Sequence, residues 1–202
     1  MNKLNLRHVP LVPMLLLLSL FISACGTSQK TDFYQLEERS ALSLMDIEKG
    51  AVIGVGPINL PEYINRPQIV TRLSKHHLKV SEFNRWIEPV NDSVRRLLVI
   101  NLSNNLNSNR VYSIPGYDRA QSLDLRIGID VGRFDGQLGK DVLLEARWSL
   151  YDKNDKAILT KVSLISMPAN GQDYSALVLA MNNALQALGE EVSQAVAKHL
   201  AK

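Results

Sequence analysis

The chain has 202 residues, and its 23 lysines and arginines against 20 acidic residues give a net charge of only +3. This balance, with no basic cluster longer than Arg95-Arg96, argues against nucleic acid as a partner. The length suits one domain with its own hydrophobic core, and a single cysteine excludes an intramolecular disulfide.

Residues 1–24 have the features of a secretory signal peptide. Lys3 and Arg7 precede an apolar run over 11–22, which ends at the small residues Ser23 and Ala24. A helix of about 12 residues is roughly 18 Å long, too short for a hydrocarbon core of about 30 Å. We therefore expect an export signal that is cleaved off, which leaves 21 basic and 20 acidic residues, a net charge of +1.

Cys25 follows Ile22-Ser23-Ala24, which matches a bacterial lipobox. We expect Cys25 to become the mature N-terminus and to carry a diacylglycerol and an N-acyl chain such as palmitate, with no other cofactor. Two or more chains, at about 0.8 kcal/mol per buried CH₂, give a lasting anchor. Gly26 stands where enterobacterial lipoproteins retained at the inner membrane have Asp, so we expect the outer membrane, with the protein facing the periplasm.

The mature chain divides into a lipidated tether over 25–31, in which the six residues 26–31 span at most roughly 20 Å, and a single domain over 32–202. Alternation and turn residues predict short strands over 32–36, from 51 to Pro57 or just beyond, and over 69–73 and 78–83. A polar stretch over 43–49 reads as helical. Pro89 suits the first turn of a helix of about 17 residues, and a strand over 110–114 precedes a Pro115-Gly116 turn.

From Leu123 apolar and polar residues alternate, which predicts a strand with one buried face. Arg133-Phe134 breaks the alternation and Asp135-Gly136 reads as a turn, so we expect a bulged hairpin there. Strands over 142–151 and 157–167 complete an antiparallel meander, and an apolar stripe from Tyr174 towards Leu200 predicts a long helix lying on it. The fold class is α+β: a two-layer sandwich of an antiparallel sheet with two main helices on one face.

Residues that could do chemistry do not form a catalytic pattern. His76 and His77 point to opposite faces of an extended segment, so a solvated turn is favoured over a metal site. Gly54-Val55-Gly56-Pro57 lacks the Gly-Lys-Ser/Thr of a phosphate loop, which favours closely packed strand backbone. We predict that the protein is not an enzyme and holds no metal.

The stretch over 59–72 is unusual because two prolines stiffen a loop that carries Tyr and Arg. Such loops favour binding, since little entropy is lost on docking. A packed crossover covering the sheet edge fits the same residues equally well. The candidate partner-binding residues are Pro61, Glu62, Tyr63, Ile64, Arg66, Pro67, Arg85 and Trp86.

Four stretches resemble the ABC-type transport auxiliary lipoprotein family. They are GPINLPEYINRPQIVTR (56–72), EFNRWIEP (82–89), DLRIGIDVGRFDG (124–136) and LEARWSLYD (144–152). The resemblance implies an outer-membrane lipoprotein without catalytic residues. Such a protein works beside an inner-membrane-anchored mammalian-cell-entry (MCE) protein and its multi-span membrane companion, moves lipid between membranes and supports membrane integrity.

A short tether keeps the domain near the outer membrane, so an extended MCE shaft would have to reach it. A homo-oligomeric ring of this chain around the shaft would act as a docking collar. Two alternatives remain: a lipid-binding periplasmic chaperone, which needs an apolar cavity, and a passive envelope-stabilising lipoprotein that binds peptidoglycan or an outer-membrane barrel.

Overall fold

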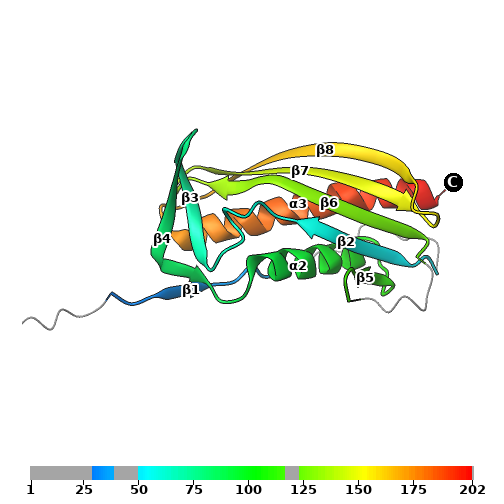
Figure 1. Ribbon diagram of the computed structural model, residues 1–202, viewed down its shortest axis with the longest axis horizontal. Helices are drawn as coiled ribbons and strands as arrows, with labels where there is room; N and C mark the ends of the chain where they lie inside the picture. The colour runs from blue at the N-terminus through cyan, green and yellow to red at the C-terminus, as the bar shows by residue number, and fades with distance from the viewer. Residues whose placement is uncertain (1–28, 39–49, 117–122, 202) are drawn as a thin grey trace, which may run out of the picture. The chain divides into compact units, whose positions relative to one another are not determined.

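A computed structural model describes residues 29–38, 50–116 and 123–201, and from Thr31 onward they belong to one compact unit. The predicted helix over 43–49 lies outside the described residues. The elements, shown in Figure 1, are β1 (Asp32–Tyr34), β2 (Ile53–Asn59), β3 (Gln68–Ser74), β4 (His77–Trp86), α2 (Val90–Asn105), β5 (Val111–Ser113), β6 (Leu125–Gly136), β7 (Asp141–Asp152), β8 (Ala157–Pro168) and α3 (Tyr174–Leu200). The predicted α+β sandwich is confirmed.

The main sheet has five strands in the order β5-β2-β6-β7-β8. Strands β6, β7 and β8 form the predicted antiparallel meander. The sheet is mixed rather than antiparallel throughout, because β2 runs parallel to both β5 and β6. Parallel neighbours need a long crossover connection, and the segment from β3 to α2 provides it between β2 and β5.

Helices α2 and α3 lie side by side on one face of this sheet (Figure 1). Helix α2 contacts β2 and β5, and α3 contacts β6, β7 and β8. The alternation predicted from Leu123 places Leu125, Ile127 and Ile129 in this interface, each almost fully buried. Trp148 is fully buried, and its indole N–H donates to the Ser163 hydroxyl at 2.8 Å. Side chains therefore fill the space between the sheet and the helices.

The end of β6 differs from the prediction. The bulge occurs as expected, between Val131 and Arg133. Asp135 and Gly136 do not form the turn, because both still pair with β7, and the reversal follows over 137–140, where Gly139 has a φ of +73°. The bulge absorbs the break in alternation, so the strand continues past it. Asp135 is consequently a buried strand residue.

The glycines of β2 pack closely against the chain that follows β5. A Cβ at Gly54 would lie 2.5 Å from the Ile114 Cδ1 atom, and one at Gly56 would lie 2.1 Å from the Ile114 carbonyl oxygen. Gly56 also has a φ of +141°, a conformation that suits glycine. The prediction of closely packed strand backbone is confirmed.

A second sheet, β1-β4-β3, lies at one end of the main sheet (Figure 1). Strand β1 runs parallel to β4, and β3 and β4 form an antiparallel hairpin. His76 lies in the turn of this hairpin and His77 begins β4, both exposed to solvent as predicted. No helix of the described ranges is long and apolar enough to span a membrane.

Candidate functional site

The loop over 61–67 connects β2 to β3 and is folded back on itself. The backbone N–H groups of Ile64 and Asn65 donate to the Pro61 carbonyl, and that of Arg66 donates to the Ile64 carbonyl. This turn buries Ile64, whereas Glu62, Arg66 and Pro67 stay exposed. The loop therefore has features of both structures that the sequence suggested, a packed crossover and a binding loop. One side of it covers the core, and the other side faces solvent.

Three of the candidate residues meet around a shallow hollow. Arg66 and Pro67 from the loop and Trp86 from the end of β4 line it together with Ile87 and Glu88, and its volume is about 320 Å³. The backbone N–H of Trp86 donates to the Pro67 carbonyl at 2.7 Å, which fixes the loop to β4. We call this feature the Trp86 hollow. Trp86 itself is 7% exposed, whereas Ile87 is 58% exposed at the rim.

Arg85 does not share this hollow. It pairs in register with Phe33 of β1 and Gln68 of β3, and successive strand residues point to opposite faces, so it lies on the face away from Trp86. Its neighbour Asn84 accepts a hydrogen bond from the Tyr34 hydroxyl at 2.9 Å and donates to the Ser81 hydroxyl. Asn84 therefore ties β1 to β4.

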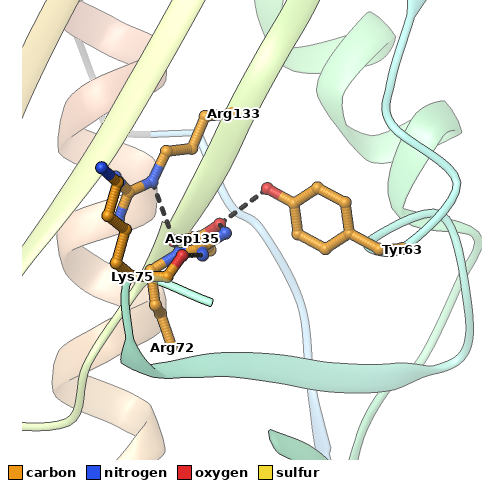
Figure 2. Close-up of polar contacts among 5 residues, drawn as sticks. All are labelled: Tyr63, Arg72, Lys75, Arg133 and Asp135. Carbon is orange, nitrogen blue, oxygen red and sulfur yellow. Dashed lines mark hydrogen bonds and ion pairs between the residues drawn. The ribbon is translucent and has the colours of Figure 1, made fainter. Parts of the chain in front are cut away.

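Asp135 is the centre of a polar cluster that also holds Tyr63. The side chains of Tyr63, Arg72 and Arg133 converge on its carboxylate, which is fully buried (Figure 2). Arg72 donates twice, from Nε at 2.7 Å and from Nη2 at 2.7 Å. Tyr63 donates from its hydroxyl at 2.6 Å, and Arg133 donates from Nε at 3.1 Å. We call these four residues the Asp135 cluster.

The electrostatics of the Asp135 cluster keep the carboxylate ionised. Burial opposes the charge, but the hydrogen bonds from Arg72 and Tyr63 and the charges of Arg133 and Arg72 outweigh it, so the pKa of Asp135 lies below its usual range. Burial, followed by the hydrogen bond to Asp135 and its charge, raises the pKa of Tyr63 to about 12. At neutral pH Tyr63 is therefore a hydroxyl donor and Asp135 an acceptor.

The Asp135 cluster holds the loop over 61–67 in place and does not present a reactive group. Tyr63 ties the loop to β6, and Arg72 ties β3 to the same strand. Over the described ranges no three His, Cys, Asp or Glu side chains lie close enough together to hold a metal ion. The Asp135 cluster was not predicted from the sequence because Asp-Gly is a strong local turn signal. The break in alternation at Arg133-Phe134 was the one sequence feature that could have indicated a strand continuing past a bulge.

Comparison with known proteins places the chain in a family. Residues 34–193 match the model of the ABC-type transport auxiliary lipoprotein component family, so the chain belongs to that family. It is thus an envelope lipoprotein of the transport auxiliary class, which agrees with the expectation of a protein that is not an enzyme. No curated protein matches its sequence.

Two crystal structures share the fold. A protein from Xanthomonas campestris has a TM-score of 0.69 at 19% identity, covering 85% of this chain and 95% of that one. An uncharacterized protein has a TM-score of 0.70 at 17% identity, covering 83% of this chain and 99% of that one. These likenesses support the fold of the described domain.

Proposed function

We propose that this chain is a lipid-anchored accessory protein of the outer membrane that docks an inner-membrane-anchored MCE protein in a system for intermembrane lipid transport. The observation that carries the proposal is the family match over residues 34–193, together with the lipobox that ends at Cys25. A tether of at most roughly 20 Å confines the domain to one membrane. The partner must therefore span the periplasm.

The Trp86 hollow is the proposed docking surface. At about 320 Å³ it can take one or two side chains of a partner protein. Ile87 offers exposed apolar surface at its rim, and Arg66 offers a guanidinium that already contacts Gln68. Apolar and Arg side chains around a preformed hollow are the residues that commonly dominate protein interfaces.

A docking protein is better supported than a lipid carrier. Trp148 and Phe134 are fully buried between the sheet and the helices, where a carrier would need room for acyl chains. Copies of the chain could also form a ring around the shaft of the MCE protein, since head-to-tail contacts close into rings when the rotation permits. The same hollow would then contact the next copy or the shaft.

The test truncates the exposed anchors of the Trp86 hollow. The double variant Arg66→Ala and Ile87→Ala should lower affinity for the MCE protein, because loss of such anchors commonly costs about 2 kcal/mol, roughly a 30-fold weaker Kd. Affinity is measured by co-purification and titration, and native mass reports any ring. Tyr63 is unsuitable for this test because its hydroxyl bonds to Asp135.

The matched control is Arg147→Ala with Leu179→Ala, an exposed arginine of β7 and a half-exposed leucine of α3, neither of which lines the hollow. The control should bind like the wild type. If the Arg66 and Ile87 variant is folded and keeps both its partner affinity and its native mass, the hollow is not the docking surface.

A further inference from the structure

A second hollow with a different character lies beside the Asp135 cluster. It has a volume of about 690 Å³ and lies between the β3–β4 hairpin and the turn that joins β6 to β7. Its lining includes four cationic side chains, which are Arg72, Lys75, Arg133 and Lys140. We call it the basic groove. Asp141 is the one acidic residue among its described lining, and its carboxylate accepts a hydrogen bond from the Ser166 hydroxyl at 2.6 Å.

The cations of the basic groove keep much of their hydrogen-bonding capacity. An arginine has five N–H donors. The Nε–H of Arg133 donates to Asp135. Its terminal nitrogens, Nη1 and Nη2, form no hydrogen bond with any described residue. The Lys75 and Lys140 ammonium groups form no ion pair with any described carboxylate. Asp135 offsets only part of the charge, so the groove carries an excess of positive charge.

The geometry of the groove is fixed in advance. Arg72 is held by two bonds to the buried carboxylate of Asp135 and by a third, at 2.9 Å, from Nη1 to the Lys75 carbonyl. This third bond ties the hairpin turn, from which Lys75 extends, to the cluster (Figure 2). On the other wall, Gly139 shapes the turn that presents Lys140. A ligand would meet cations whose backbone is already ordered, so little entropy is lost on binding.

Apolar surface borders these charges. Leu73, which is 43% exposed, and the half-buried Leu143 also line the groove. Guanidinium and ammonium groups together suit a phosphate, which accepts several charge-assisted hydrogen bonds. Adjacent leucines suit the carbon chain of an amphiphile. We propose that the basic groove binds the phosphate of an anionic phospholipid headgroup through Arg133, Lys75 and Lys140, with Leu73 and Leu143 against its first chain carbons.

This inference goes beyond the docking function and does not depend on it, because the groove and the Trp86 hollow share no lining residue. It gives the domain a direct contact with lipid. A phosphate could also come from a soluble ester, and the experiment distinguishes these two sources.

The experiment uses the full mature lipoprotein in a neutral detergent, titrated with dihexanoyl phosphatidylglycerol, dihexanoyl phosphatidylcholine and glycerol phosphate by calorimetry. We expect phosphatidylglycerol to bind more tightly than phosphatidylcholine, whose choline cation would meet the basic groove. Lys75→Gln with Lys140→Gln should weaken phosphatidylglycerol binding roughly 30-fold, because each of the two lost charges is worth about 1 kcal/mol near water. These variants leave the Asp135 cluster intact.

The control is Lys153→Gln with Lys156→Gln, which removes two exposed lysines from the turn between β7 and β8. It should bind like the wild type, and added salt should weaken binding of the wild type. If glycerol phosphate binds as tightly as phosphatidylglycerol, the ligand of the groove is a soluble phosphate ester, and the proposal of a lipid headgroup is refuted. The proposal fails altogether if the groove variant binds as the wild type does, or if neither anionic ligand binds better than phosphatidylcholine.

Discussion

At the scale of single residues, Asp135 joins its own strand to the loop over 61–67 and to β3, since Tyr63 and Arg72 lie 72 and 63 residues away from it in sequence. Its carboxylate accepts from Tyr63 in the loop, from Arg72 on β3 and from Arg133 on its own strand. A buried charge of this kind is stable only when it is paired and hydrogen-bonded. The Trp86 hollow and the basic groove each include a segment that Asp135 holds in place, so one carboxylate supports both proposed surfaces.

Replacing this carboxylate by an amide should destabilise the fold. Asp135→Asn keeps the volume but leaves Arg72 and Arg133 without their counter-ion, and we expect a loss of about 2 kcal/mol in the free energy of unfolding, in the range for hydrogen bonds to charged groups. Urea unfolding at neutral pH measures it. Asp130→Asn, an exposed carboxylate on the same strand, should cost less than about 0.5 kcal/mol.

The pH dependence provides a second check on Asp135. Its pKa is lowered in the folded protein, so the ionised carboxylate contributes stability above the unfolded pKa of about 3.9, and this stability is lost as the pH falls through the folded value. The difference between wild type and Asp135→Asn should therefore narrow below about pH 4. A difference that stays constant down to about pH 2 would show that the charge of Asp135 is not the stabilising feature.

At the scale of elements, helix α3 closes the main sheet. It begins at an Asp173 cap, whose carboxylate accepts from the Ala176 N–H at 2.8 Å. Its buried face recurs at steps of three and four residues, as Leu177, Met181, Leu185, Leu188 and Val192 show. Leu179 of the same helix points to solvent and is 51% exposed. The helix thus contains both a core leucine and a matched surface leucine.

Introducing a charge on the two faces of α3 should have very different effects. Leu185 is 1% exposed, so Leu185→Asp loses a buried apolar contact and forces a carboxylate into the core, at a cost of several kcal/mol. Leu179→Asp should change the free energy of unfolding by less than about 1 kcal/mol. Thermal unfolding followed by circular dichroism compares the two. Equal melting temperatures for Leu185→Asp and the wild type would contradict this packing.

The elements predicted well are those whose signal is local and periodic. The meander β6-β7-β8 and helix α3 follow from alternation and from the apolar stripe, and β3 and β4 lie where two short strands were predicted. The parallel position of β2 between β5 and β6 has no such signal, because its partners lie across a long crossover. Besides the misleading Asp-Gly turn signal, the Asp135 cluster has no local signal of its own, because Arg72 lies 63 residues from Asp135 in sequence.

At the scale of the whole molecule, the proposed lipid anchor at Cys25 would decide which partners the domain can reach. Residues 26–31 extend at most roughly 20 Å, so a domain attached through Cys25 would stay close to its membrane. A headgroup site in the basic groove would be useful only within reach of lipid, and the docking proposal likewise requires the outer membrane. Both proposed surfaces therefore depend on where Cys25 is inserted, which makes the anchor the feature to test in cells.

The anchoring residues make two separable predictions. Cys25→Ser should leave the precursor uncleaved by the lipoprotein peptidase and without acyl chains, because in this proposal the thiol accepts the diacylglyceryl group. Gly26→Asp should leave acylation intact but retain a fraction of the protein at the inner membrane of an enterobacterial host. Mass spectrometry of the N-terminal peptide reports the first change, and membrane separation on a density gradient reports the second. An unmodified Cys25 in the wild type would refute the lipid anchor itself, whereas acylated wild type at the inner membrane would refute only its outer-membrane location.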